Sequence, residues 1–592
     1  MDSAGSAKKG RTDAFCAPTA DEGVERDTDA NTGASRCLDA FVVALSQACD
    51  RSGWYASTLQ LQLASLPFCA ACRSVPTLRL VVDDDDEQMP LHLLEPPEPP
   101  PRDPGRWIPT RVPRFRALGA MWFSPTAAAL RRPIYALEDA VELEFDDDFE
   151  DNLDGAVWPR RLDRLTLRGA NTLDGVSWPM SLRKLTLGGA FNGPIEKIPW
   201  PACLQHLHFG CFFNQPIERV AWPRSLQHLT FGDKENGWFN QEVEGVTWPE
   251  SLQQLEFSQN FDHPVERMAF PQALQQVSFG FAFNQPVENV SWPTALQHIY
   301  FGVQFNRPVV GVTWPPSLLT LDFGDRFNKA IARVAWPCFL RQVTFGRDFN
   351  KTIAGVSWPG SLQRLVFGDF FNRAIKGVSW PAGLHHLTFG LLFDQPLEAV
   401  EWPASLQQLT LGFRFEQAIE RVSWPPSLER ITFEGLFDQA VEKVTWPSCL
   451  THLTLSDSFD QPIAETAWPA SLQEILFGDK FNQPIQNVSW PISLRKLALG
   501  KAFNHPIEGT SWPASLRYLA LGCKFNQPLG GIGVWIPNLV ELTVLRVVGL
   551  YDHPLGDVQW PAGLQRLTVH KTWRWSKAWL FPRNVEVVYF DW

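Results

Sequence analysis

Apolar residues recur along this chain in a fixed order that repeats every 22 residues. In one unit they are Leu296, Ile299, Phe301, Phe305, Val309, Val312 and Trp314, and Leu318 starts the next unit. Within the unit, His298 and Tyr300 alternate with Ile299 and Phe301. Alternation at every second residue is typical of a strand with one buried face. The pattern therefore predicts a short strand from Leu296 to Phe301, with Ile299 and Phe301 directed inward.

The rest of each unit leads back to the next strand without a helix. Gly302 follows the strand and permits a backbone conformation that a β-carbon would penalise. Pro308 and the Trp314-Pro315 pair keep the return extended, because proline fixes its own φ and restricts the residue before it. No stretch of the unit has the length or the 3.6-residue period of a helix. We therefore expect the return to be extended or short 3₁₀ structure.

An aromatic residue followed by proline marks the same point of each unit. From Phe270 these pairs step by 22 residues through Trp292, Trp314, Trp336, Trp358, Trp380, Trp402, Trp424, Trp446, Trp468, Trp490 and Trp512. Upstream the series includes Trp248, Trp222, Trp200, Trp178 and Trp158, and downstream it continues less regularly through Trp535, Trp560 and Phe581. The longer step between Trp222 and Trp248 indicates an insertion near Glu235 to Trp238, which we expect to bulge outward. This series gives about 20 units. Internal repeats of this length mark a repeat architecture.

A single unit cannot enclose its own apolar side chains, so neighbouring units must stack to complete the core. Stacking also joins the short strands into one continuous parallel ladder. The sequence therefore predicts a β-rich solenoid of about 20 coils of 22 residues.

The repeat resembles the FNIP repeats, a 22-residue relative of leucine-rich repeats. The pattern Pro-x-Ser-Leu … Leu-x-Phe-Gly-x-x-Phe-Asn-x-Pro-Ile is matched by Pro469, Ser471, Leu472, Ile475, Phe477, Gly478, Phe481, Asn482, Pro484 and Ile485. The resemblance covers about residues 137 to 592. This chain differs by placing Trp before proline in most units and Gln between Asn and Pro, as at Gln215 and Gln285. The resemblance implies a curved, leucine-rich-repeat-like solenoid used for protein contacts, and it implies no catalytic residues.

Two further residue series recur once per coil, and we interpret both as structural. One series is Asn214, Asn240, Asn284, Asn306, Asn328, Asn350, Asn372, Asn482, Asn504 and Asn526, with Asp262, Asp394, Asp438 and Asp460 in its place elsewhere. Side chains repeated at this interval can hydrogen-bond to the backbone of the neighbouring coil. The Trp series is expected to form core or a stacked covering of the core.

The outward strand positions are the candidates for function. A parallel sheet covered on both faces should read as continuous apolar residues, whereas these strands alternate, so one face is in contact with water. We expect this polar, varied face to be the concave recognition surface. Its candidate partner-binding residues are His228, Gln254, Gln276, His298, Tyr300, Arg364 and Arg430. A merely solvated face is the alternative.

Two patches refine this prediction. Leu476, Ala498 and Ala520 follow one another on the face beside Lys496 and Tyr518, and an apolar strip with a tyrosine and a cation favours a contact site. Repeat drift explains the strip equally well. The second patch is His206, His208 and His228, whose imidazoles could ligate zinc, but no carboxylate or thiolate accompanies them, so we interpret them as solvated and expect no metal.

The chain before the array is divided by composition. Residues 1–36 are predicted to be a disordered tail, 37–82 a small region with a short amphipathic helix, 83–106 an acidic and proline-rich linker, and 107–136 an N-terminal cap. Cys69 and Cys72 form a lone CxxC pair, a weak metal signal. At the other end we expect a C-terminal cap with Val585, Val588 and Phe590 at the core spacing.

Charge and composition exclude some classes of function. Lys plus Arg total 52 against 64 Asp plus Glu, a net charge of −12, which argues against a nucleic-acid partner. No run of 18 apolar residues and no secretory signal occur, so we expect no membrane partner. Ten scattered cysteines favour a reducing compartment, the cytoplasm or nucleus. No phosphate-binding glycine loop, HExxH or GxSxG motif is present, so we predict neither enzyme activity nor a cofactor.

The sequence therefore favours a non-catalytic scaffold that binds a partner protein on its concave face. One alternative is a substrate-selecting adaptor, for example in ubiquitin ligation, with its effector segment in residues 1–136. The other is a purely architectural spacer.

Overall fold

The computed structural model describes residues 121–123, 140–145, 153, 156–169, 173–232, 236–544, 553, 556–571, 581–582 and 584–590. The predicted tail, the helix-containing region and the linker lie outside these residues, as do Cys69 and Cys72. Of the predicted cap at 107–136, the short strand Met121–Phe123 is described. The description below concerns the repeat array by itself.

The array is one parallel sheet in which each strand pairs with the next strand along the chain. The strands are β1 (Met121–Phe123), β2 (Glu142–Phe145), β3 (Arg164–Leu167), β4 (Lys184–Leu187), β5 (His206–Phe209), β6 (His228–Phe231), β7 (Gln254–Glu256), β8 (Gln276–Ser278), β9 (His298–Tyr300), β10 (Thr320–Phe323), β11 (Gln342–Phe345), β12 (Arg364–Val366), β13 (His386–Thr388), β14 (Gln408–Leu411), β15 (Arg430–Phe433), β16 (His452–Thr454), β17 (Glu474–Leu476), β18 (Lys496–Ala498), β19 (Tyr518–Leu521), β20 (Glu541–Val544), β21 (Arg566–His570) and β22 (Glu586–Phe590). One four-residue helix, α4 (Ile532–Trp535), is described near the end.

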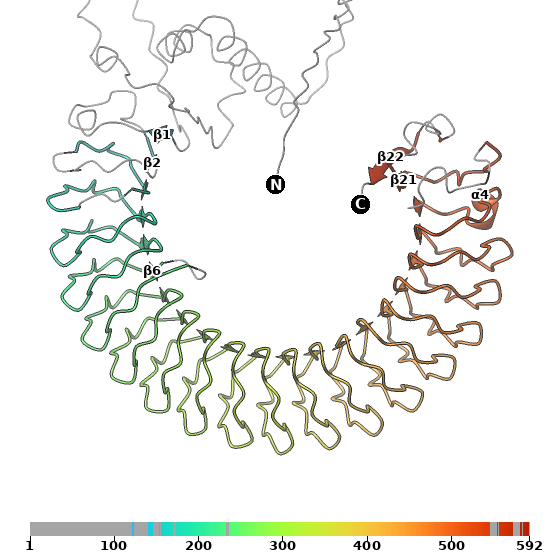
Figure 1. Cartoon of the computed structure of the whole chain (residues 1–592), viewed down its shortest axis with the longest axis horizontal. Coiled ribbons are helices and arrows are strands. Elements are labelled where there is room, and N and C mark those ends of the chain that lie inside the picture. Colours follow the sequence, from blue (N-terminus) through green and yellow to red (C-terminus); the bar gives the residue numbers. More distant parts are fainter. Residues whose placement is uncertain are drawn as a thin grey trace, which may run out of the picture. The chain divides into compact units, whose positions relative to one another are not determined.

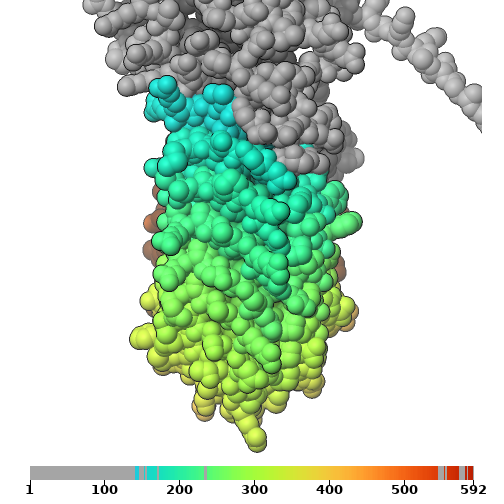
Figure 2. All heavy atoms as spheres, turned by 90° about the vertical axis from the view of Figure 1, so that its left-hand side faces the viewer, coloured from blue at the N-terminus to red at the C-terminus, as the bar shows by residue number. Residues whose placement is uncertain are grey.

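The coils curve, with the strands on the inner side and the return segments on the outer side (Figure 1). The space-filling view shows the coils packed directly on one another, without gaps between successive units (Figure 2). These features confirm the predicted curved solenoid.

Strand β9 (His298–Tyr300) begins two residues later and ends one residue earlier than the predicted strand from Leu296 to Phe301. Leu296 lies in a turn, with its N–H donating to the carbonyl of Pro293 at 3.1 Å. The carbonyl of Gln275 accepts from the N–H groups of both Gln297 and His298, at 2.8 and 3.0 Å, so regular pairing starts only at His298. Leu296 is nevertheless fully buried, which explains why its position reads as part of the strand.

Three turns bend each coil. In the same unit they are closed by hydrogen bonds from Phe305 N to Gly302 O at 3.0 Å, from Val312 N to Val309 O at 3.5 Å and from Leu318 N to Pro315 O at 3.1 Å. No helix lies between β9 and β10, as predicted.

Aromatic columns run through the core of the array. The ring of Phe371 stacks on Phe349 at 6.0 Å and on Phe393 at 6.2 Å between centroids, and it packs against Phe367 at 4.2 Å. Buried rings at these separations contribute both apolar area and favourable stacking geometry. The core is therefore continuous from coil to coil.

The tryptophans form a second column, as predicted. Trp380 and Trp402 stack with centroids 6.2 Å apart and ring planes 14° apart. The buried indole N–H groups of both have no hydrogen-bond partner, whereas that of Trp512 donates to the carbonyl of Ile507 at 3.3 Å. Most of this column thus stabilises the fold through stacking and apolar burial.

The asparagine series is a ladder, which confirms its structural interpretation. The side-chain oxygen of Asn284 accepts from the backbone N–H of Asn306 at 2.9 Å, and Asp262 accepts from Asn284 in the same way at 2.8 Å. The Gln that follows Asn joins the ladder, because Gln285 Nε2 donates to Asp262 Oδ1 at 2.9 Å. This hydrogen bond gives a structural reason for the Gln that this chain places between Asn and Pro.

In several coils the close approach of the previous coil requires glycine after the strand. A Cβ on Gly280 would overlap the carbonyl oxygen of Ser258, and one on Gly302 would overlap that of Gly280. Ser258 itself occupies a glycine position, where its buried hydroxyl donates to the carbonyl of Phe239 at 2.8 Å.

The described end of the insertion lies at the surface. Trp238 is 55% exposed and lies edge-on to Phe212 at 5.0 Å. Glu235 lies outside the described residues.

The predicted orientation of the last strand is wrong by one residue. Val588 and Phe590 of β22 are 37% and 40% exposed, whereas Val587 and Tyr589 pack against the core. The pairing of Leu567 with Val587 and of Val569 with Tyr589 places those two residues on the core side. The partly buried position of Val585 is as predicted.

Phe371→Ala should lower the free energy of unfolding by about 3–5 kcal/mol, because it leaves a cavity in a fully buried column. Arg364→Ala, on the exposed side of the sheet, should change it by less than about 0.5 kcal/mol. Urea melts followed by tryptophan fluorescence measure both. Equal shifts for the two variants would contradict the column's role.

Gly280→Ala should destabilise the array by about 1–3 kcal/mol or more, because the new methyl group meets the backbone of the previous coil. Gly360→Ala is the matched control: no atom lies within 4 Å of a Cβ there, so the change should stay within about 0.5 kcal/mol. A harmless Gly280→Ala in the same melts would show that coil spacing does not depend on glycine.

Candidate functional site

The candidate site is the concave face of the sheet, where side chains at the first and third strand positions point away from the core. We call residues at the first strand position the first row and those two residues later the second row. His228, Gln254, Gln276, His298, Arg364, Arg430, Lys496 and Tyr518 lie in the first row, and Tyr300 and Leu476 lie in the second. All ten predicted residues therefore share one face.

The N-terminal part of this face is rich in imidazole and amide groups. The rings of His206 and His228 stack at 4.2 Å, and Nδ1 of His228 lies 2.7 Å from Oε1 of Gln254. Together with Thr186, His208 and Glu256, these residues line a hollow of about 410 Å³. Burial lowers the pKa of His206, and the neighbouring His228 lowers it further. Within the described ranges, no three His, Cys, Asp or Glu side chains are grouped to hold a metal ion.

The middle of the face contains a half-buried carboxyl group. Asp322 of β10 lies in the second row beside Tyr300, and burial, followed by the charge of Asp325, raises the pKa of Asp322 to about 6. Burial, Asp322 and Glu256 together raise the pKa of Tyr300. Burial lowers the pKa of His298, whose Nδ1 has no hydrogen-bond partner.

Arg364 and Arg430 share the row but do not form a pair. Both are exposed, on β12 and β15, and the first-row residues His386 and Gln408 of β13 and β14 lie between them. The structure thus does not gather all ten candidates into one cluster.

The C-terminal candidates do come together. Leu476, Ala498 and Ala520 are direct neighbours in the ladder. The ammonium group of Lys496 lies 3.0 Å from Glu474 Oε1 and 5.5 Å from the centre of the Tyr518 ring.

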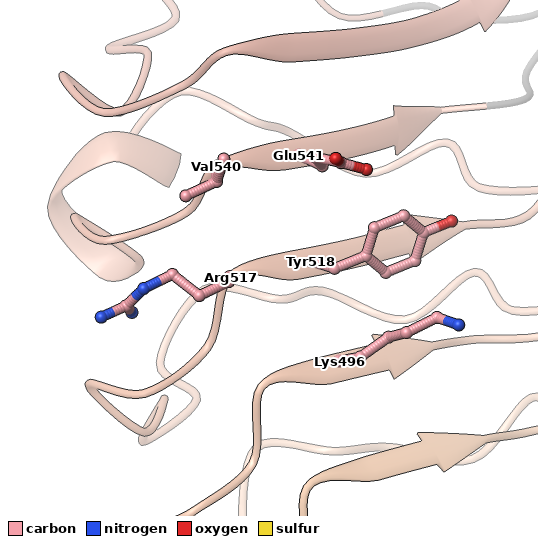
Figure 3. Close-up of a pocket in the computed structure, with 5 residues that line it drawn as sticks. All are labelled: Lys496, Arg517, Tyr518, Val540 and Glu541. Carbon is pink, nitrogen blue, oxygen red and sulfur yellow. The ribbon is translucent and has the colours of Figure 1, made fainter.

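A hollow of about 450 Å³ adjoins this cluster, lined by Lys496, Arg517, Tyr518, Val540 and Glu541. Figure 3 shows Lys496, Tyr518 and Glu541 extending toward the ends of their strands, while Arg517 extends off the start of β19. Arg517, Val540 and Glu541 were not predicted. The unit that contains Val540 and Glu541 departs from the 22-residue spacing, and Arg517 precedes β19, so it lies outside the two rows.

An exposed apolar group in the turns that follow β12, β13 and β14 was not predicted. Phe370, Leu391 and Phe413 are 41–43% exposed and occupy the two positions between the post-strand glycine and the core phenylalanine in successive coils. The guanidinium of Arg347 lies 5.7 Å from the centre of the Phe370 ring. Apolar residues in three successive turns were the available signal, since surface turns have no packing reason to be apolar.

Comparisons with known proteins identify the repeat. The family model FNIP Repeat matches residues 200–234, 239–282, 283–326, 393–435, 437–480, 467–502 and 481–524. The chain is similar to the solved structure of CroV588, described as a novel circular leucine-rich-repeat protein, at 28% identity and a TM-score of 0.49, covering 76% of this chain and 84% of that one. It is also similar to YopM from Yersinia enterocolitica WA-314, at 19% identity and a TM-score of 0.39, covering 76% and 87%. No curated protein matches. Among the described residues, no helix has both the length and the apolar character needed to cross a membrane.

Asp322→Asn should stabilise the array at pH 8 and have little effect near pH 4. The folded-state pKa of about 6 lies above the unfolded value of about 3.9, so the stability contributed by the protonated carboxyl is present below about pH 3.9 and is lost as pH rises through about 6. The expected gain at pH 8 is about 3 kcal/mol. Urea melts of both proteins between pH 4 and 8 measure it, and parallel stability profiles would contradict the raised pKa of Asp322.

Proposed function

This chain is a FNIP-repeat protein, and we propose that it is a non-catalytic scaffold that holds a partner protein against its concave face. A repeat solenoid of this kind is typical of proteins that bind other proteins. The single observation that supports the concave face is its alternation: the inward row is uniformly apolar, while the outward rows carry imidazole, amide, phenol and charged groups on an uncovered sheet.

Exposed apolar groups beside the polar face also support this proposal. Phe370, Leu391 and Phe413 adjoin the strand ends of β12 to β14, and Tyr518 lies in the first row of β19. Interfaces combine aromatic anchors with a polar surround. The concave face and its adjoining turns contain both elements.

We propose that this scaffold lies inside the cell. Cys203, Cys338 and Cys449 are exposed free thiols, and Cys211 is a half-buried one. Free thiols at the surface are compatible with a reducing compartment.

Affinity capture with the full chain tests the proposed function. The variant Arg364→Glu/Arg430→Glu reverses two exposed charges in the first row, and Arg219→Glu/Arg333→Glu makes the same change of net charge in exposed return turns. Proteins retained from a lysate of the producing cells are quantified by mass spectrometry. A partner should be retained by the parent chain and the control, and reduced at least ten-fold by the first-row variant.

Two other outcomes would contradict the proposed scaffold function. Equal retention by both variants, together with capture by residues 1–136 alone, would indicate the adaptor. Failure of the full chain to retain any protein would indicate an architectural spacer.

A further inference from the structure

The surface over β17 to β20 has more cations than carboxylates, whereas the chain as a whole has a negative net charge. Its cations are Lys480, Arg495, Lys496, Lys501, Arg517 and Lys524, and its carboxylates are Glu474, Asp479 and Glu541. The whole chain has a net charge of −12, so a cationic excess here is a local feature. We call these strands and the residues that immediately flank them the β17–β20 surface.

The three carboxylates of this surface already have cationic partners. Glu474 pairs with Lys496 at 3.0 Å, Asp479 pairs with Lys501 at 2.7 Å, and Glu541 pairs with Arg566 of β21 at 3.6 Å. These pairs leave the excess positive charge on other residues of the surface.

Three of the remaining cations are exposed and make no ion pair within the described part of the chain: Lys480, Arg495 and Arg517. The guanidinium of Arg517 donates to the backbone carbonyls of Ala514 and Leu516, at 2.8 and 3.0 Å. Cations with no carboxylate partner are available to a ligand of opposite charge.

An uncharged strip lies between the cations at the start of the strands and the cations at their end. Leu476, Ala498 and Ala520 form the strip and are half-buried neighbours in the second row. Arg495 and Arg517 precede their strands, whereas Lys480 follows β17, so positive charge borders the strip at both strand ends. The arrangement offers aliphatic contact in the centre and charge at the edges.

The hollow beside the strip provides a place for a side chain of the ligand. Tyr518 lies between Lys496 on one strand and Glu541 on the next, and Arg517 lies at the far end of the same hollow (Figure 3). An aromatic ring that is already held by a cation loses little conformational freedom when it is covered.

We propose that the β17–β20 surface binds an extended acidic peptide segment of a partner protein, with aliphatic side chains on the strip and carboxylates facing Arg495, Arg517 and Lys480. This proposal rests on the proposed function, because it names the chemistry of the partner. Parallel strands lie about 4.8 Å apart, so four strands span about 14 Å, which matches about four or five extended residues.

The surface favours a peptide over a single-stranded nucleic acid. Sequence-tolerant binding of single strands uses successive aromatic rings on which bases stack. Here the second row offers Leu476, Ala498 and Ala520, with Tyr518 as the one ring on β17 to β20 that faces outward. Aliphatic contacts between cations fit an acidic, leucine-containing peptide.

The test uses the full chain and a fluorescein-labelled heptapeptide of alternating glutamate and leucine, with binding followed by fluorescence anisotropy. The parent chain should bind saturably, and raising the salt concentration from 50 to 300 mM should weaken binding because exposed charges are screened. Arg495→Glu/Arg517→Glu should weaken binding at least ten-fold. Arg219→Glu/Arg333→Glu, with the same net charge, should stay within two-fold.

A second variant separates binding from folding. Arg495→Gln/Arg517→Gln removes the charges without reversing them and should weaken binding at least three-fold, with an unchanged urea midpoint. If a heptapeptide with glutamine in place of glutamate bound as tightly as the glutamate heptapeptide, the proposal would be overturned. It would also be overturned if Arg219→Glu/Arg333→Glu weakened binding as much as Arg495→Glu/Arg517→Glu. A single-stranded oligonucleotide that binds the same surface more tightly than the heptapeptide would also overturn it.

Failure of this proposal differs from failure of the proposed function. A captured partner that is lost with Arg364→Glu/Arg430→Glu but kept with Arg495→Glu/Arg517→Glu would leave the scaffold in place and refute the β17–β20 surface. A chain that captures no protein yet binds the heptapeptide would refute the scaffold instead.

Discussion

Backbone contact between successive coils sets the geometry of this protein. Where Gly280 meets Ser258 and Gly302 meets Gly280, the chains approach too closely for a side chain directed at the previous coil. That approach keeps the strands in register and brings each phenylalanine ring onto the ring one coil away. It also allows the side chain of Asn284 to reach the backbone N–H of Asn306. Strand ladder, aromatic column and asparagine ladder thus all depend on one spacing.

A constant spacing also explains where the repeat can vary. A residue added within a strand would move the side chains that follow it in that strand to the opposite face, so extra residues are accommodated outside the strands. The longer unit that contains Trp238 follows this rule, and its flanking core residues Phe231 and Phe239 remain fully buried. Stability in such an array is a sum of neighbouring contacts, so a local change is absorbed locally.

The concave rows take no part in the stacked core, and their chemistry is therefore free to differ from one end to the other. Imidazoles and amides occupy the first row of β5 to β8, a half-buried carboxyl lies at Asp322, and paired and unpaired cations gather over β17 to β20. A scaffold of this design can present several distinct surfaces on one rigid sheet. The candidate residues are accordingly better described as separate patches than as a single cluster.

Periodicity in the sequence was sufficient to predict the coil, its parallel stacking and the asparagine ladder. It also predicted the buried ring of Phe371 and the face on which all ten candidate residues lie. Each of these features depends on a local pattern that is repeated many times. Where the repeat weakens, the same reasoning failed: Val588 and Phe590 were assigned to the core, but pairing with β21 places Val587 and Tyr589 there. The start of the strands, the raised pKa of Asp322, the exposed group at Phe370 and the hollow at Arg517 depend on which coils become neighbours and on how far each side chain is covered. Those quantities arise from contacts between residues about 22 positions apart or more, so only the assembled array decides them.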